Sequence, residues 1–167
     1  MYLEIGCGDA SLPFALSGIT REVLGLDVTD ALVDFAAAPA NFRFLKTDGV
    51  AIPLADNSVD LAHSDQLMEH LHVEDAEAQL REIHRVLRPG GTLHFVEHGL
   101  APDEPVQRWQ HRLEPVQKRV FGGCHLTRAI PDLVTGSGFE ITELDSFYED
   151  GAPKPLAAFS LGAAVSA

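Results

Sequence analysis

The sequence predicts an α/β fold in which a mostly parallel sheet is covered by helices on both faces. Short apolar runs alternate along the chain with segments of helical periodicity, and this alternation is typical of parallel sheets. The chain has 167 residues, 46% of them hydrophobic, which suffices for the core of one domain. We therefore expect residues 1–167 to form a single domain.

The elements follow one another in a regular order. Strands are expected at Tyr2–Ile5, Val23–Val28, Arg43–Lys46, Val59–Ser64, Gly91–Val96, Glu140–Phe147 and Ala157–Ala163. Helices are expected at Pro13–Leu16, Ala31–Ala37, Glu74–Leu87, Val106–Val120 and Ile130–Thr135. The helix over Glu74–Leu87 has the strongest pattern, because acidic residues lead it and Pro89-Gly90-Gly91 ends it.

The first strand runs directly into a glycine turn, Gly6-Cys7-Gly8. Glycine lets the backbone turn sharply and lie close to a ligand. The second strand ends at Asp27, about 20 residues after the glycines, where a carboxylate can accept hydrogen bonds from ribose hydroxyls. These two segments indicate one half of a nucleoside-binding fold.

The residues around the turn favour a ligand with a positive centre. In the dinucleotide pattern the third position after the second glycine is glycine or alanine, whereas this chain has Ser11 there. Asp9 would repel a pyrophosphate, and Glu4 adds negative charge. A sulfonium or ammonium ligand therefore fits better than NAD, although an NAD-type oxidoreductase remains the alternative.

Four segments in order resemble the motifs of class I S-adenosylmethionine-dependent methyltransferases. They are Glu4–Gly8 for the first motif, Gly25–Val28 for the ribose-binding strand end, Thr47–Leu54 with Asn57–Leu61 for the adenine-binding turn and fourth strand, and Arg85–Leu93 for the helix end and turn before the fifth strand. The resemblance implies a Rossmann-like, seven-stranded, mostly parallel sheet whose last strand is antiparallel. It also implies methyl transfer from S-adenosylmethionine, which leaves S-adenosylhomocysteine, to the thiol, amine or hydroxyl of a small, apolar acceptor.

The resemblance also implies where the cofactor lies, at the carboxyl ends of the strands. The expected cofactor-binding residues are Glu4, Gly6, Cys7, Gly8, Asp27, Val28, Asp48, Gly49, Ser64 and Asp65. Several have structural alternatives, since Asp27 could cap a helix and Asp48 could shape a turn. Cys7 is expected to be a small packed residue rather than a nucleophile.

The acceptor is expected beyond the fifth strand. Three segments resemble a subgroup of the family that includes membrane-associated alkyl-thiol methyltransferases. They are Phe95–His98, the helix with Trp109, and Gly122–Arg128. The expected substrate-binding residues are Gln66, His98, Trp109 and His125. His98 is also the candidate general base, because imidazole titrates near neutral pH, with loop packing as its alternative role.

Composition restricts the partners and the compartment. A net charge of −13 disfavours nucleic acid, whose phosphates would be repelled. No run reaches the ~20 apolar residues needed to span a bilayer, so no membrane span is expected. Cys7 and Cys124 cannot form a disulfide framework, which indicates a cytoplasmic location. No cluster of histidines and cysteines has a common zinc spacing, so no metal is expected.

The first strand begins at Met1, whereas members of the resembled family usually carry a helix before it. We therefore expect the N-terminal helix to be missing and part of the sheet to be left open. Such a surface would favour a homo-oligomer. It would also fit a cofactor-binding relic without activity.

Overall fold

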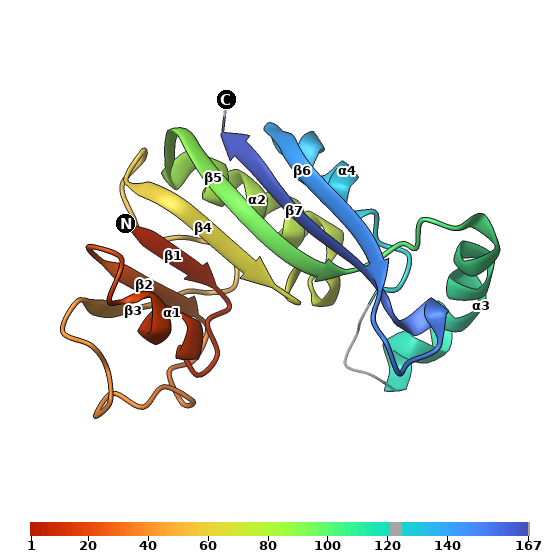
Figure 1. Ribbon diagram of the computed structural model, residues 1–167, viewed down its shortest axis with the longest axis horizontal. Coiled ribbons are helices and arrows are strands. Elements are labelled where there is room, and N and C mark those ends of the chain that lie inside the picture. The colour runs from red at the N-terminus through yellow and green to blue at the C-terminus, as the bar shows by residue number, and fades with distance from the viewer. Residues whose placement is uncertain (121–124, 167) are drawn as a thin grey trace.

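Seven strands form one twisted sheet within residues 1–120 and 125–166, which the computed structural model describes (Figure 1). The strands are β1 (Tyr2–Ile5), β2 (Val23–Asp27), β3 (Phe42–Lys46), β4 (Val59–Asp65), β5 (Leu87–His98), β6 (Phe139–Tyr148) and β7 (Ala158–Ser166). Their order is β3-β2-β1-β4-β5-β7-β6, and β7 runs antiparallel to both of its neighbours. The predicted fold class, with a mostly parallel sheet and an antiparallel last strand, is confirmed.

Helices lie on both faces of this sheet. They are α1 (Ser11–Leu16), α2 (Val73–Val86), α3 (Glu104–Val120) and α4 (Ile130–Gly136), with short 3-10 turns η1 (Met68–His70) and η2 (Lys154–Leu156). Helix α1 packs on β1 and β2, whereas α2 and α4 lie on the opposite face (Figure 1). Helix α3 lies beyond the end of β5, away from the sheet (Figure 1).

The core consists of two separate clusters of buried side chains. Leu3 and Ile5 belong to the larger cluster, which includes Leu80 and Ile83 of α2. A smaller cluster forms around Cys7 and Ala10 on the side of α1. The carboxyl ends of the central strands therefore rest on packed side chains from both faces.

The helix predicted over Ala31–Ala37 is wrong, because this segment folds as successive turns. The Asp34 carboxylate accepts a hydrogen bond from the Ala36 amide at 3.0 Å, and local bonds of this kind compete with helix formation. Leu32 and Phe35, which would have formed an apolar helix face, are 67% and 53% exposed. The only support for a helix here was a short apolar pattern.

Strand β5 is longer than the predicted Gly91–Val96. Leu87 already pairs with Val59 of β4, and at the other end His98 pairs with Phe159 of β7. Pairing with β7 therefore extends the strand and carries Glu97 and His98 to the edge where ligands bind in parallel sheets.

The face of β1, β4 and β5 on the side of α1 contains a cavity of about 530 Å³. Leu12 and Leu16 of α1 line it together with Leu61, His63 and His94 of the strands. Among the residues that the structure describes, no helix combines the length and the apolar character needed to cross a membrane.

Candidate functional site

A cavity of about 200 Å³ lies at the carboxyl ends of β1, β2 and β3, where an open parallel sheet binds its ligand. Its lining consists of Ile5, Gly6, Leu26, Asp27, Val28, Thr47, Gly49, Leu67, Leu71 and Gln79. Four predicted cofactor-binding residues, Gly6, Asp27, Val28 and Gly49, therefore meet around one space. Its walls are mostly apolar, with the Asp27 carboxylate at one side.

The glycine turn brings bare backbone to this cavity. Gly6 and Gly8 have φ of 69° and 52°, in the left-handed region that favours glycine. The amides of Gly6 and Cys7 both donate to the Leu26 carbonyl, at 2.8 and 3.0 Å. A Cβ atom at Gly6 would lie 3.1 Å from Leu67 Cδ2, so a side chain there would push into the cavity wall.

Asp27 links the turn to the end of β2. Its Oδ2 accepts a hydrogen bond from the Gly8 amide at 3.0 Å, and its Oδ1 accepts one from the Thr29 amide at 3.2 Å. Each carboxylate oxygen has a further lone pair, so the group can still accept from ribose hydroxyls. Asp27 is therefore placed both to shape the turn and to hold a ligand.

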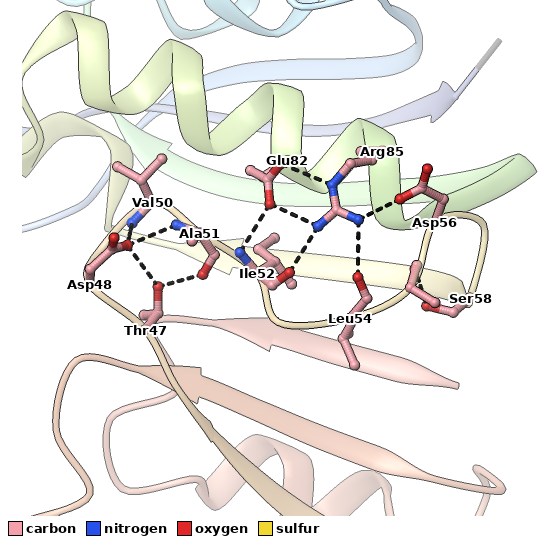
Figure 2. A network of polar contacts seen from close by, with 11 residues as sticks. Thr47, Asp48, Val50, Ala51, Ile52, Leu54, Asp56, Ser58, Glu82 and Arg85 are labelled. Carbon is pink, nitrogen blue, oxygen red and sulfur yellow. Dashed lines mark hydrogen bonds and ion pairs between the residues drawn. The ribbon is translucent and has the colours of Figure 1, made fainter.

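Asp48 shapes the turn after β3 (Figure 2). Its Oδ1 accepts hydrogen bonds from the amides of Ala51 and Val50, at 2.9 and 3.0 Å. These bonds hold the pKa of the Asp48 carboxyl below its usual value. Thr47 and Gly49 line the cavity on either side of Asp48, whose contact with adenine stays a prediction.

Hydrogen bonds and ion pairs around Arg85, which the sequence did not predict, hold the next part of this loop (Figure 2). Arg85 of α2 donates to the carbonyls of Leu54 and Ile52, at 3.0 and 2.8 Å. The same guanidinium contacts both oxygens of Glu82, and Asp56 at 2.6 Å. The sequence contains one sign of these contacts, because Glu82 and Arg85 lie three residues apart on a predicted helix. That spacing also occurs in ordinary surface ion pairs, so it did not single out this site.

Glu4 and Cys7 lie beside the cavity rather than in its lining. The Glu4 carboxylate accepts hydrogen bonds from the Tyr2 hydroxyl and, at 3.0 Å, from Nδ1 of His63, on the sheet face opposite Leu3 and Ile5. Burial, with the nearby charges of Asp27 and Glu4, raises the pKa of the Cys7 thiol to about 12. Cys7 is therefore a protonated, packed thiol rather than a nucleophile.

The pair of Glu4 and His63 leads to a pH prediction for stability. Its hydrogen bond to Glu4 raises the pKa of His63, so the folded chain holds this proton more tightly than the unfolded chain does. The stabilisation is complete below the unfolded pKa of about 6.5 and is lost as pH rises through the folded pKa. We expect His63→Gln to lower the unfolding free energy more at pH 5.5 than at pH 9, as measured by urea denaturation.

His94 provides the matched control for this prediction. It lies beside His63 on the neighbouring strand, in register, and it is exposed. His94→Gln should lower stability little, with no comparable dependence on pH. Equal losses for His63→Gln at both pH values would contradict the assignment.

At the carboxyl end of β4 and directly after it, the side chains differ in burial. Ser64 is buried and donates to Glu97 Oε1 at 2.6 Å, whereas Asp65 and Gln66 are exposed. Gln66 has a left-handed φ of 49°, which turns the chain into η1. None of these three side chains lines the 200 Å³ cavity, although Leu67 and Leu71 do.

The predicted acceptor residues lie in different places. His98 is buried, packs edge-on against Phe159 with ring centroids 5.2 Å apart, and has a pKa lowered by burial. Trp109 of α3 is 55% exposed. His125 lines a cavity of about 570 Å³ between α2 and α4, which contains none of the predicted cofactor residues. The roles of Gln66, His98, Trp109 and His125 stay predictions, and Gly122, Gly123 and Cys124 lie outside the described residues.

Comparison with known proteins gives a family match and curated relatives. Residues 3–95 match a family model described as a methyltransferase domain. Thiol S-methyltransferase TMT1B of Rattus norvegicus is 41% identical over 134 residues, which cover 75% of this chain and 54% of the relative. The Homo sapiens TMT1B is 33% identical over 164 residues, or 92% of this chain and 64% of that protein. The chain spans about half the length of the first of these relatives.

Solved structures show the same fold. A putative methyltransferase from Bacillus halodurans C-125 superposes with a TM-score of 0.78 at 14% identity, covering 99% of this chain and 91% of that one. An S-adenosylmethionine-dependent methyltransferase from Mesorhizobium loti gives 0.74 at 24% identity, covering 98% and 90%. At these identities the likeness extends to the fold alone.

Proposed function

Because the chain belongs to the methyltransferase-domain family, we propose that it binds S-adenosylmethionine at the strand ends and methylates a small, apolar thiol. Family membership confirms the resemblance to methyltransferases that the four motifs carry, and it supports the predicted cofactor and reaction class. The thiol is chosen over the amine and hydroxyl because both TMT1B relatives are named thiol S-methyltransferases.

One observation carries the proposal, namely the convergence of the Gly6 turn, Asp27 and Gly49 on a single cavity. Asp27 would bind the ribose hydroxyls, and the backbone at Thr47 and Gly49 would face the adenine. The apolar walls from Leu26, Leu67 and Leu71 suit a flat, uncharged ring. We extend the cofactor site to Glu4, Cys7, Gly8, Val28, Asp48, Ser64 and Asp65, the remaining residues that the motifs indicate.

The cofactor, when bound, supplies an activated methyl group on a sulfonium. The protein therefore has to align the acceptor with that methyl group and exclude water. A thiol acceptor loses its proton as it is methylated. Burial lowers the pKa of the His98 imidazole, which favours the neutral ring that a general base needs to take such a proton. Gln66, Trp109 and His125 complete the proposed acceptor side.

The proposal is tested by titration calorimetry followed by turnover. We expect S-adenosylhomocysteine to bind more tightly than NAD, and we expect a small aryl or alkyl thiol to be methylated faster than its hydroxyl and amine analogues. Tighter binding of NAD would favour the oxidoreductase. Cofactor binding with no methylation of any of the three acceptors would favour the relic.

Several wider features belong to the same proposal. We propose that residues 1–167 form one domain in the cytoplasm, with no nucleic-acid partner because the net charge is −13.

A homo-oligomer would form through the face with the 530 Å³ cavity, where Leu12 is 39% exposed and Ile19 83% exposed. Sedimentation equilibrium of the wild type and of Ile19→Lys would measure that association.

A further inference from the structure

Glu97 has an ionisable side chain in a buried position, where a charged group is energetically costly. It stands near the carboxyl end of β5 and is fully buried. Its Oε1 accepts the Ser64 hydroxyl at 2.6 Å, and its Oε2 accepts the amides of Leu67 and Met68 at 2.9 and 2.8 Å. Ser64 lies at the end of β4 and the other two donors lie in the turn after it. One side chain of β5 therefore holds both the end of β4 and that turn.

That turn forms part of the candidate cofactor site. Leu67 and Leu71 line the 200 Å³ cavity, and Leu67 lies directly over Gly6. The turn begins at Gln66 with a left-handed φ of 49°, a conformation that needs support from its surroundings. The two amides that donate hydrogen bonds to Glu97 belong to the two residues that immediately follow Gln66. Their hydrogen bonds fix where the Leu67 side chain meets the glycine turn.

A second buried carboxyl group lies against Glu97. Glu69 is 2% exposed, and its Oε2 has no hydrogen-bond partner among the described groups. Its carboxyl group interacts with that of Glu97. Two carboxylates in such surroundings cannot both ionise at low cost, so the pair retains a proton. Burial, together with Glu69, raises the pKa of Glu97 well above its usual range.

The other charged and titratable groups nearby come from three further places. His70 Nε2 lies 3.6 Å from Glu69 Oε1, and His98 follows Glu97 on β5. The His125 amide donates to the Glu69 carbonyl at 3.0 Å. Arg128 donates to the carbonyls of Met68 and Leu71, so it also holds this turn.

We propose that Glu97 is a positioning residue of the cofactor site, which holds Leu67 over the Gly6 turn while sharing one proton with Glu69. The inference rests on the proposed function for its ligand, though not for the position of the turn. As pH rises, loss of the shared proton sets two negative charges against each other, and the turn loosens. Cofactor affinity should therefore fall at high pH.

Two substitutions separate the hydrogen bonds of Glu97 from its charge. Glu97→Gln keeps an oxygen for the two amides and offers an NH₂ group to Glu69, so it imitates the protonated pair. Glu97→Leu removes every acceptor. Val134→Ala in α4 is the control for general destabilisation, because Val134 is fully buried in the larger core cluster and does not line the cavity.

The first measurement needs no ligand and uses amide hydrogen exchange by NMR on the chain alone. We expect the amides of Leu67 and Met68 to be protected in the wild type, in Glu97→Gln and in Val134→Ala, and to exchange at least tenfold faster in Glu97→Leu. Protection of both amides in a folded Glu97→Leu would overturn the proposal. If S-adenosylhomocysteine does not bind at all, the proposed function fails while this measurement still decides the role of Glu97.

The second measurement is the affinity for S-adenosylhomocysteine between pH 6 and pH 9. We expect the wild type to bind progressively more weakly as pH rises, Glu97→Gln to bind equally well throughout, and Glu97→Leu to bind roughly tenfold more weakly than the wild type at pH 6. A wild type and a Glu97→Gln variant with the same pH profile would overturn the shared proton. Equal loss of affinity in Glu97→Gln and Glu97→Leu would overturn the positioning role.

Discussion

Asp27→Ala is expected to weaken binding of S-adenosylhomocysteine by roughly 10- to 100-fold in a chain that remains folded. The carboxylate is placed to accept hydrogen bonds from the ribose, and we expect its interaction with the ribose to contribute about 1.5–3 kcal/mol in total. It also holds the Gly8 amide at 3.0 Å, so its removal loosens the glycine turn that approaches the ligand. Because Asp27 is partly exposed at the end of β2, the large core stays intact.

Titration calorimetry measures the affinity, and thermal denaturation confirms that the variant folds. Asp30→Ala is the matched control, since Asp30 is an exposed aspartate three residues further on that does not line the cavity. It should leave the affinity within twofold of the wild type. Asp27→Asn should fall between the two, because one amide oxygen can still accept from Gly8. An unchanged affinity in folded Asp27→Ala would remove Asp27 from the site.

The parts of the fold that were predicted correctly carry local signals. The Gly6 turn, the acidic end of β2 and the end of α2 before Pro89 are each visible within a few residues of sequence. The failures depended on distant or competing contacts. The segment Ala31–Ala37 is apolar enough for a helix, but the Asp34 side chain stabilises a turn instead. The extension of β5 depends on β7, more than 60 residues later in the chain.

The same distinction applies to the site. Gly6, Asp27 and Gly49 line the cavity because each follows directly from the geometry of a strand end. The position of Glu4 could have been anticipated, since strand alternation places it with Tyr2 and opposite Leu3 and Ile5. Glu97 and Glu69 were missed as a pair because they are 28 residues apart in sequence and meet only through the pairing of β4 with β5. The sign of this pair in the sequence was an acidic residue, Glu97, directly after the apolar residues Phe95 and Val96.

Phe95→Ala is expected to lower the unfolding free energy by about 3–5 kcal/mol, the largest loss of stability that we predict. Among the described residues Phe95 is the bulkiest fully buried side chain, and it lies in the second half of β5, within the larger core cluster. For a chain of this length the melting temperature should fall by roughly 6–20 °C. Phe35→Ala, at a residue that is 53% exposed, should cost no more than about 0.5 kcal/mol in urea denaturation.

Gly162 explains why this ring fits and gives the prediction its strictest test. Gly162 of β7 pairs with Phe95, and a Cβ atom there would lie 2.3 Å from Phe95 Cζ. Gly162→Ala should therefore destabilise the wild type by about 1–3 kcal/mol through overpacking. In the Phe95→Ala background the ring is gone, so the same methyl group should cost much less and should partly fill the cavity. A double-mutant cycle by urea denaturation would show this as a coupling of at least about 1 kcal/mol, whereas additive losses would mean that the ring does not occupy the space that Gly162 leaves.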